Sequence, residues 1–239
     1  MSKYEIVEFA TKKDLSNAGA IFIKEYIELV LQKEERMSIS LSGGSTPLLI
    51  YNFLSNEDIE WEKVDLFLGD ERWVDKSNKL SNEFMVRNSL LKPGKPASKA
   101  RFYTYPTTEF NSPIESSDYF NKLIQGYFKS FPPSFDLILL GLGNDGHTAS
   151  LFPFSNSLKD TNRASTVSNG NGIDRITLTA PVLCSSKKVI FFISGSDKNL
   201  ALKRLLDINE STERTPAKLV DTKNSISLFC DCDSLGNNI

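Results

Sequence analysis

The stretch FDLILLGLGNDGHTASLFP, residues 135–153, predicts one strand of the fold and the place where its chemistry lies. Its apolar run at 137–140 is typical of a strand that is buried on both faces. Glycines end this strand, and the turn after it carries Asp145 and His147, the only histidine of the chain. Because ligands of open α/β sheets bind beyond the carboxyl ends of the strands, we predict a functional site at this turn.

The acid and the imidazole can also be interpreted as purely structural residues, since a single histidine is often a surface or core residue. Here, however, Asp145 lies two positions before His147. In an extended segment such residues point to the same side, so the carboxylate can orient the ring or share its pocket. This arrangement favours a site role for both residues.

The glycines of the turn also match a cofactor motif. Gly141, Gly143 and Gly146 fit the G-x-G-x-x-G pattern of dinucleotide-binding proteins. That pattern should open a helix and be followed, about 20 residues later, by an acid at the end of a second strand. Pro153 ends any helix soon after the glycines, and residues 154–160 have no strand pattern. The sequence therefore argues against a nicotinamide cofactor.

Length and composition narrow the class of protein. A chain of 239 residues with 40% hydrophobic residues can bury a large core, and we expect one domain over 1–239. The net charge of −2 argues against nucleic acid or a membrane surface as the main partner. The sequence has no signal peptide and no apolar run near the ~20 residues of a membrane span, so we expect a cytoplasmic protein.

The three cysteines, Cys184, Cys230 and Cys232, form no C-x-x-C pair. With a single histidine in the chain they also cannot complete a typical zinc site. We therefore interpret them as buried thiols of a reducing compartment and expect no metal.

Strand and helix patterns alternate along the chain. We predict strands at residues 5–9, 37–41, 64–68, 102–105, 137–140, 176–179, 188–194 and 225–230. Helices are predicted near residues 15–29, 48–54, 81–91, 114–128 and 198–206, the first opened by a capping box at Thr11 and Asp14. Residues 155–172 are expected to form a surface loop that could act as a lid. The alternation predicts an α/β fold with a mostly parallel sheet covered by helices on both faces.

Three more predicted strands end in turns that suit an anion. The turn SGGSTP at 42–47 exposes backbone N–H groups, and we place the helix N-cap at Thr46 and the first helical residue at Pro47. The turn GDERWV at 69–74 carries Arg72, which can bind phosphate or carboxylate through two hydrogen bonds. The turn GSDK at 195–198 carries Lys198.

Each of these turns alone has a simpler interpretation: a helix cap, a solvated corner or a surface charge. Together they favour a site, because the carboxyl ends of parallel strands meet at one edge of the sheet. We therefore expect phosphate-binding groups to surround His147.

Five motifs in the same order resemble one enzyme family. SGGSTP at 42–47, GDERWV at 69–74, GLGNDGHTASLFP at 141–153, DRITLT at 174–179 and GSDK at 195–198 are similar to motifs of the 6-phosphogluconolactonases. The resemblance runs from about residue 10 to 230. It implies the three-layer α/β/α fold that glucosamine-6-phosphate deaminases share with ribose-5-phosphate isomerases. The implied reaction is hydrolysis of 6-phospho-D-glucono-1,5-lactone to 6-phosphogluconate in the pentose phosphate pathway, without a metal or organic cofactor.

The resemblance also implies roles for individual residues. The histidine base of the family corresponds to His147, and its neighbouring acid to Asp145. Asp70 and Arg72 correspond to the charged pair of the family at a strand end. Lys198 corresponds to the phosphate-binding lysine, with Arg175 as a helper. The expected contacts to the substrate are completed by Ser42, Gly43, Gly44, Ser45, Thr46 and Gly146.

The chemistry expected from these residues is attack of water on the lactone carbonyl. His147 accepts the proton of the water, and Asp145 fixes its tautomer. Backbone N–H groups of Gly43 and Gly44, or the guanidinium of Arg72, face the oxyanion.

Two other functions remain open at this point. A deaminase or isomerase acting on glucosamine 6-phosphate would keep the fold and the histidine, although the strings DERW and ASLFP favour the lactonase. A non-catalytic sugar-phosphate sensor would usually carry a DNA-binding module, for which the chain has no spare length. A serine hydrolase is disfavoured because a G-x-S-x-G elbow is absent. As partners we expect a small sugar-phosphate lactone, no nucleic acid and no membrane, in a monomer or small homo-oligomer.

Overall fold

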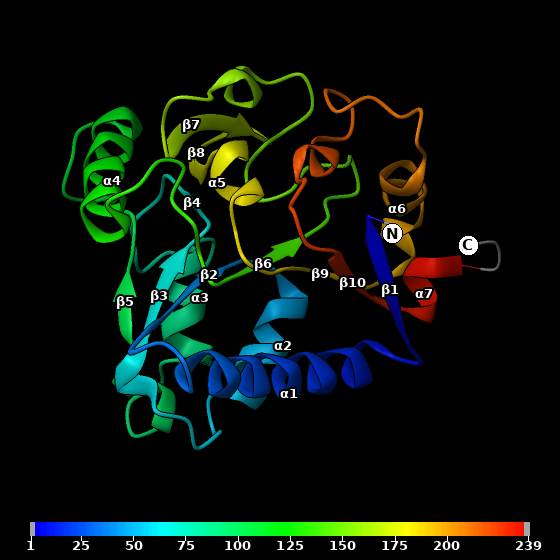
Figure 1. Cartoon of the computed structure of the whole chain (residues 1–239). Helices are drawn as coiled ribbons and strands as arrows, with labels where there is room; N and C mark the ends of the chain where they lie inside the picture. Colours follow the sequence, from blue (N-terminus) through cyan, green and yellow to red (C-terminus); the bar gives the residue numbers. More distant parts are fainter. Residues whose placement is uncertain (1–2, 237–239) are drawn as a thin grey trace.

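The computed structural model of the chain describes residues 3–236, which form two sheets and the helices around them (Figure 1). The larger sheet is parallel throughout, with the strand order β1-β10-β9-β6-β2-β3-β5. Its strands are β1 (Tyr4–Phe9), β2 (Met37–Leu41), β3 (Val64–Leu68), β5 (Arg101–Tyr103), β6 (Leu137–Gly141), β9 (Val189–Ile193) and β10 (Ile226–Asp231).

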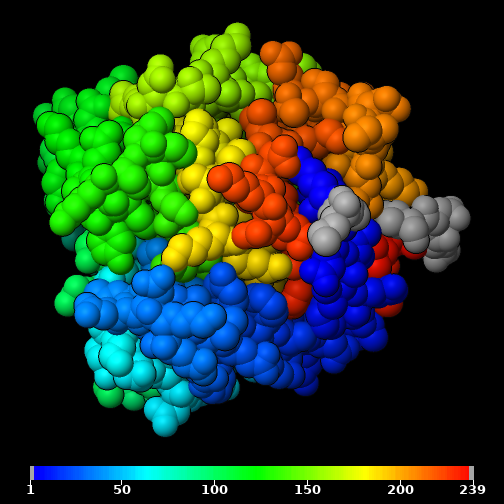
Figure 2. Space-filling view, in the orientation of Figure 1, coloured from blue at the N-terminus to red at the C-terminus, as the bar shows by residue number. Residues whose placement is uncertain are grey.

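Helices cover both faces of the larger sheet, as predicted (Figure 1). The long helix α1 and the neighbouring α2 lie along one face, while α4, α5 and the smaller sheet lie on the other side. In Figure 2 the blue segment of α1 crosses the lower half of the molecule, and the green segment of α4 lies above it. The helices are α1 (Lys12–Leu31), α2 (Ser45–Leu54), α3 (Asn82–Ser89), α4 (Pro113–Phe128), α5 (Ala180–Cys184), α6 (Asn199–Leu206) and α7 (Cys232–Leu235).

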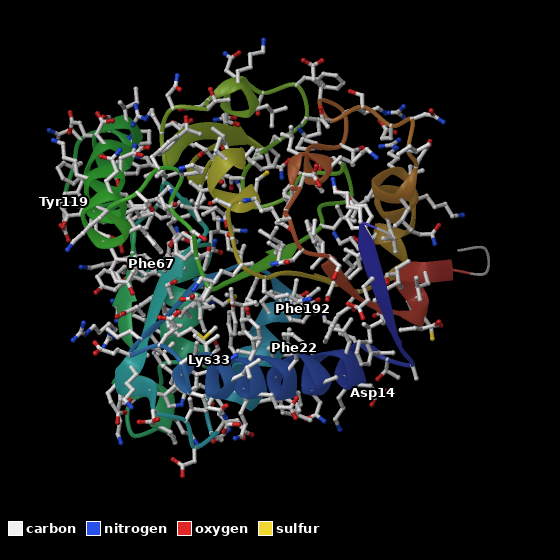
Figure 3. All side chains as sticks on the ribbon, in the orientation of Figure 1. Asp14, Phe22, Lys33, Phe67, Tyr119 and Phe192 are labelled. Carbon is white, nitrogen blue, oxygen red and sulfur yellow. The ribbon has the colours of Figure 1, made fainter. Side chains whose placement is uncertain are left out.

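Aromatic side chains join the sheet to its helices. Phe229 of β10 packs against Phe22 of α1 at 5.7 Å and against Phe192 of β9 at 5.6 Å between ring centres. Figure 3 labels Phe22 and Phe192, which lie between α1 and the sheet. Phe67 of β3 stacks on Tyr103 at 4.5 Å on the other half of the sheet. Strands buried on both faces match the continuous apolar runs of the sequence, because a parallel sheet between two helix layers exposes neither face to water.

The predicted cap of α1 is confirmed, and α3 has a cap that was not predicted. Thr11 caps α1 by accepting a hydrogen bond from the backbone N–H of Asp14, and Ser81 caps α3 by accepting one from Phe84. In a capping box the side chain of Asp14 would accept a hydrogen bond from the backbone N–H of Thr11. Here the Asp14 carboxylate accepts one from the Thr11 hydroxyl instead.

The prediction of a long loop over residues 155–172 is wrong for residues 165–170. Ser165–Gly170 form strand β7, which pairs antiparallel with β8 (Ile173–Leu178), and β8 pairs with the short strand β4 (Asp70–Arg72). The strand has no apolar alternation to reveal it, because its buried positions are polar. Ser165 is one of them: its hydroxyl lies 2.8 Å from that of Ser117, and its N–H donates to Asn121. Polar groups that are satisfied in this way can be buried at low cost.

Candidate active site

A cavity of about 490 Å³ lies at the carboxyl ends of β2, β3, β6 and β9. This is the edge of the sheet at which the sequence predicted a site. The lining contains most of the predicted site residues, namely Ser42, Gly43, Gly44, Ser45, Thr46, Asp70, Arg72, His147, Arg175 and Lys198. Asp145 and Gly146 are not among the lining residues, but Asp145 contacts His147, which is one of them. Lys12, Asn82 and Asp231 also line the cavity and were not predicted.

Asp145 and His147 form a hydrogen-bonded pair on the turn after β6. Asp145 Oδ1 lies 2.6 Å from His147 Nδ1 and accepts a second hydrogen bond of 3.0 Å from the His147 backbone N–H. The contact between the two side chains was predicted. The backbone between them, however, forms a turn, which the Asp145 carboxylate closes by its hydrogen bond to the His147 N–H, and not the expected extended segment. A carboxylate can only accept hydrogen bonds, so it selects the tautomer with the proton on Nδ1. Nε2 is then free to accept a proton.

The same pair keeps Asp145 ionised. Burial acts to raise the pKa of Asp145, but hydrogen bonds from the ring and backbone of His147 outweigh it and hold the pKa below its usual value. At neutral pH the residue is therefore a carboxylate, and the tautomer of His147 stays fixed.

Close packing holds the histidine turn in place. The ring of His147 lies against Phe152, with 4.5 Å between ring centres. Gly143 passes so close to the ring that a methyl group on it would lie 2.1 Å from His147 Nδ1. Gly146 has a φ of +96°, and a methyl group on it would lie 3.0 Å from Thr215 Cα. Within residues 142–153 no helix follows the glycines, so the segment lacks the helix that the dinucleotide-binding pattern opens.

The motif GDERWV divides its side chains between the two sides of β4. Asp70 and Arg72 line the cavity, whereas Glu71 accepts hydrogen bonds from the backbone N–H groups of Asn82 and Glu83 at the start of α3. Burial raises the pKa of Glu71, although these hydrogen bonds act to lower it. Because neighbouring residues of a strand point in opposite directions, the motif supplies two site residues and one helix cap.

Asp70 is held by two residues that sequence reasoning missed. The Ser150 hydroxyl donates to Asp70 Oδ2, and Asn82 Nδ2 donates to the Asp70 carbonyl oxygen at 2.9 Å. Ser150 is itself fixed, since its N–H donates to Thr177 Oγ1 at 3.1 Å. Ser150 lies 80 positions from Asp70 in the chain, and nothing in the local sequence indicates the contact.

Two arginines face each other across the pairing of β4 with β8. Arg72 and Arg175 are register partners, and the buried Nε of each has no hydrogen-bond partner among residues 3–236. Burial lowers the pKa of Arg175, and the positive charge of Arg72 lowers it further. Like charges directly opposite each other in a sheet are destabilising. An anion between the two guanidinium groups would relieve this repulsion and satisfy their free donors.

The turn after β2 ends in the start of α2. Gly44, with a φ of +105°, is the N-cap residue, so the prediction that Thr46 caps the helix is wrong by two positions. Glycine tolerates this backbone angle, which lets the helix begin at Ser45 and leaves Pro47 in the first turn, where its missing N–H is not needed. Tyr51 anchors the turn by hydrogen bonds to both backbone groups of Ser42. The Ser42 hydroxyl is buried, and no described residue hydrogen-bonds to it.

Lys198 lies on the turn after β9, as predicted. Its ammonium nitrogen is 3.0 Å from Asp197 Oδ2. Asp231 at the end of β10 holds this turn, because its carboxylate accepts hydrogen bonds from the Gly195 N–H and the Ser194 hydroxyl. Burial acts to raise the pKa of Asp231, but these hydrogen bonds hold it below its usual value. An acid directly at a strand end was a signal that could have identified Asp231 from the sequence.

The cysteines do not converge. Cys230 is buried, Cys184 is half-buried and Cys232 is exposed at the start of α7, so the prediction of buried thiols is wrong for Cys232. Within residues 3–236 no three His, Cys, Asp or Glu side chains are grouped closely enough to hold a metal ion. In the same part of the chain no helix combines the length and apolar character that a membrane span requires.

Comparison with known proteins identifies a family and close structural neighbours. The family model described as glucosamine-6-phosphate isomerases/6-phosphogluconolactonase matches residues 10–229. A 6-phosphogluconolactonase from a Nostoc species is 33% identical over 209 residues, covering 86% of each chain. One from a Synechocystis species is 32% identical and covers 95% of each chain. The crystal structure of a 6-phosphogluconolactonase from Shewanella baltica superimposes with a TM-score of 0.85 at 30% identity, over 95% of this chain and 97% of the other.

Proposed function

The chain belongs to the family of glucosamine-6-phosphate isomerases and 6-phosphogluconolactonases, and we propose that it hydrolyses 6-phospho-D-glucono-1,5-lactone to 6-phosphogluconate. The observation that carries this proposal is the Asp145–His147 pair beside a cavity that four cationic side chains line. The reaction needs a base near the lactone carbonyl and, at a distance from this carbonyl, a binding site for the phosphate of the substrate. It would place the chain in the oxidative part of the pentose phosphate pathway, in the cytoplasm.

His147 is the general base of the proposed mechanism. Its Nε2 accepts a proton from a water molecule as the water oxygen attacks the lactone carbonyl carbon. The tetrahedral intermediate collapses by breaking the bond between this carbon and the ring oxygen, which takes the proton back from the imidazolium. Asp145 stabilises the imidazolium between the two steps, since its lowered pKa keeps it negatively charged.

Charged and backbone groups that line the same cavity stabilise the intermediate. The Arg72 guanidinium or the backbone N–H groups of Gly43 and Gly44 donate to the oxyanion. Asp70, fixed by Ser150, compensates part of the charge of Arg72 and Arg175 before the substrate binds. Such preorganised groups are effective because they need little reorganisation as negative charge develops on the carbonyl oxygen.

The phosphate of the substrate binds near Lys198 and the start of α2. The backbone N–H groups of the first turn of α2 receive no side-chain cap, and a helix N-terminus favours negative charge. Arg175 supplies a further donor from β8. Binding the remote phosphate places the carbonyl against the base, which lowers the entropic part of the barrier.

Replacing Lys198 with alanine is expected to raise KM for the lactone by about tenfold, because a charged hydrogen bond to phosphate is lost. The kcat should change little, since the chemistry lies at the other end of the substrate. Initial rates over a range of lactone concentrations measure both constants. Lys203→Ala removes an exposed lysine of α6 that does not line the cavity and serves as the matched control. An unchanged KM for Lys198→Ala would remove this residue from the phosphate site.

A coupled assay tests the proposed function directly. Glucose-6-phosphate dehydrogenase generates the lactone in the assay mixture, and the disappearance of the lactone is followed with and without the protein. A parallel assay measures ammonium release from glucosamine 6-phosphate, which the deaminases of the same family would produce. Lactone decay at the spontaneous rate would refute the proposal, and ammonium release would replace it with the deaminase function.

A further inference from the structure

Lys12 lines the cavity but belongs to none of the motifs that suggested the site. It is the first residue of α1, and its side chain extends to the first residue of α2. There its ammonium nitrogen donates to Ser45 Oγ at 2.8 Å. Among residues 3–236 no carboxylate forms an ion pair with Lys12, whereas Lys198 is paired with Asp197. Lys12 therefore lines the cavity without an ion-pair partner among the described residues.

The position of this cation is unfavourable in the absence of an anion. The N-terminal end of a helix carries partial positive charge, which repels lysine and attracts anions. Lys12 lies at the N-terminal end of α1, and its ammonium group lies at that of α2, so two helices of 20 and 10 residues add to the same positive potential. An anion bound beside Lys12 would be attracted by the ammonium group and by both helix N-termini, and these attractions would offset the repulsion between them.

Buried polar groups in the same cavity independently indicate an anionic ligand. Ser42 is only 6% exposed, and its hydroxyl has no hydrogen-bond partner within the described residues. Arg175 is 8% exposed, and its Nε likewise lacks a partner there. Both residues line the cavity together with Lys12. Buried polar groups are normally satisfied, so these donors are most simply explained by a ligand that accepts hydrogen bonds.

We infer that Lys12 is a further substrate-binding residue, which donates to the phosphate of the sugar phosphate from the α1 side of the cavity. The inference rests on the proposed function for the identity of the substrate. Ser45 holds the ammonium group in place while the site is empty. The doubly charged phosphate monoester is the chemical group recognised, because it can accept hydrogen bonds from several cations and from the start of α2 at once.

The test compares Lys12→Gln with Lys13→Gln. Lys13 is the next residue of the same helix turn, is exposed and does not line the cavity, so it controls for the loss of one positive charge. We expect Lys12→Gln to raise KM for the lactone about tenfold and to leave kcat within about twofold, since a charged contact to a non-reacting group is lost. Lys13→Gln should leave both constants within about twofold. Lys12→Arg should recover most of the affinity.

A second measurement separates this inference from the proposed function. Inorganic phosphate is titrated into each variant by calorimetry, which needs no turnover. We expect its Kd to rise about tenfold in Lys12→Gln and not in Lys13→Gln. If both KM and Kd are unchanged in Lys12→Gln, the inference is wrong even where the wild type hydrolyses the lactone. If the wild type is inactive but phosphate binding depends on Lys12, the proposed function is wrong and the anion-binding role of Lys12 stands.

Lys12→Gln removes a cation from a helix N-terminus, so we expect it to fold normally.

Discussion

Replacing His147 with alanine is expected to lower kcat for the lactone by ~10²–10⁴ and to change KM little. The chain has one histidine, so no other imidazole can take over as the base. Asp145 cannot replace it, because a carboxylate with a lowered pKa is a weak base at neutral pH. The phosphate contacts remain, which is why the substrate should still bind. Steady-state rates corrected for spontaneous hydrolysis provide the measurement.

Three comparisons make the His147→Ala result specific. The unfolding midpoint should change little, since the ring of His147 is partly exposed. Asp145→Asn should give a smaller loss of kcat, because the base remains but its tautomer and position are less well fixed. Added imidazole should restore part of the activity of His147→Ala by entering the cavity. Turnover that is unchanged in His147→Ala would exclude this residue as the base.

Replacing Gly143 with alanine is expected to lower kcat by at least ~10² while the protein stays folded. The added methyl group would lie 2.1 Å from His147 Nδ1 and 2.7 Å from Asp145 Oδ1, so the ring must rotate away and the pair must separate. Both contacts are with the ends of side chains rather than with backbone, and a change of rotamer relieves them at a small cost in stability. The loss of activity therefore comes from misplacement of the base.

Gly141→Ala is the matched control for this prediction. It adds the same methyl group two residues earlier, where no atom lies within 4 Å. We expect its kcat to stay close to that of the wild type. The comparison uses kcat rather than KM, because Gly141 lines the cavity in which the substrate binds. Free energies of unfolding from urea titrations show whether both variants are folded. Equal kcat values for the two variants would mean that the contact between Asp145 and His147 is not needed for turnover.

The parallel sheet and its helices could be predicted because their signals are local. Apolar runs such as residues 137–140 report strands buried on both faces, and Thr11 and Ser81 mark helix starts through hydrogen bonds to nearby residues. The smaller sheet could not be predicted in full. Its strand β7 buries Ser165, whose hydroxyl and N–H are satisfied by Ser117 and Asn121, more than 40 residues away in the chain.

The start of α2 shows a limit of local rules. Thr46 and Pro47 match the preferred cap and first helical residues, yet the helix begins at Ser45. The backbone angle of Gly44 decides the start, and Tyr51 fixes the chain just before it through hydrogen bonds to Ser42. A cap preference is worth only about 1 kcal/mol, which such tertiary contacts outweigh.

The sequence by itself determined which residues reach the site, because His147, Arg72 and Lys198 all follow strands of one parallel sheet, whose carboxyl ends meet at one edge. Only the tertiary structure decided how these groups pair. The register of β4 with β8 sets Arg72 opposite Arg175, and the packing of α1 on α2 brings Lys12 to Ser45. Strand register and helix packing depend on contacts between distant segments, and a local pattern of residues does not encode them.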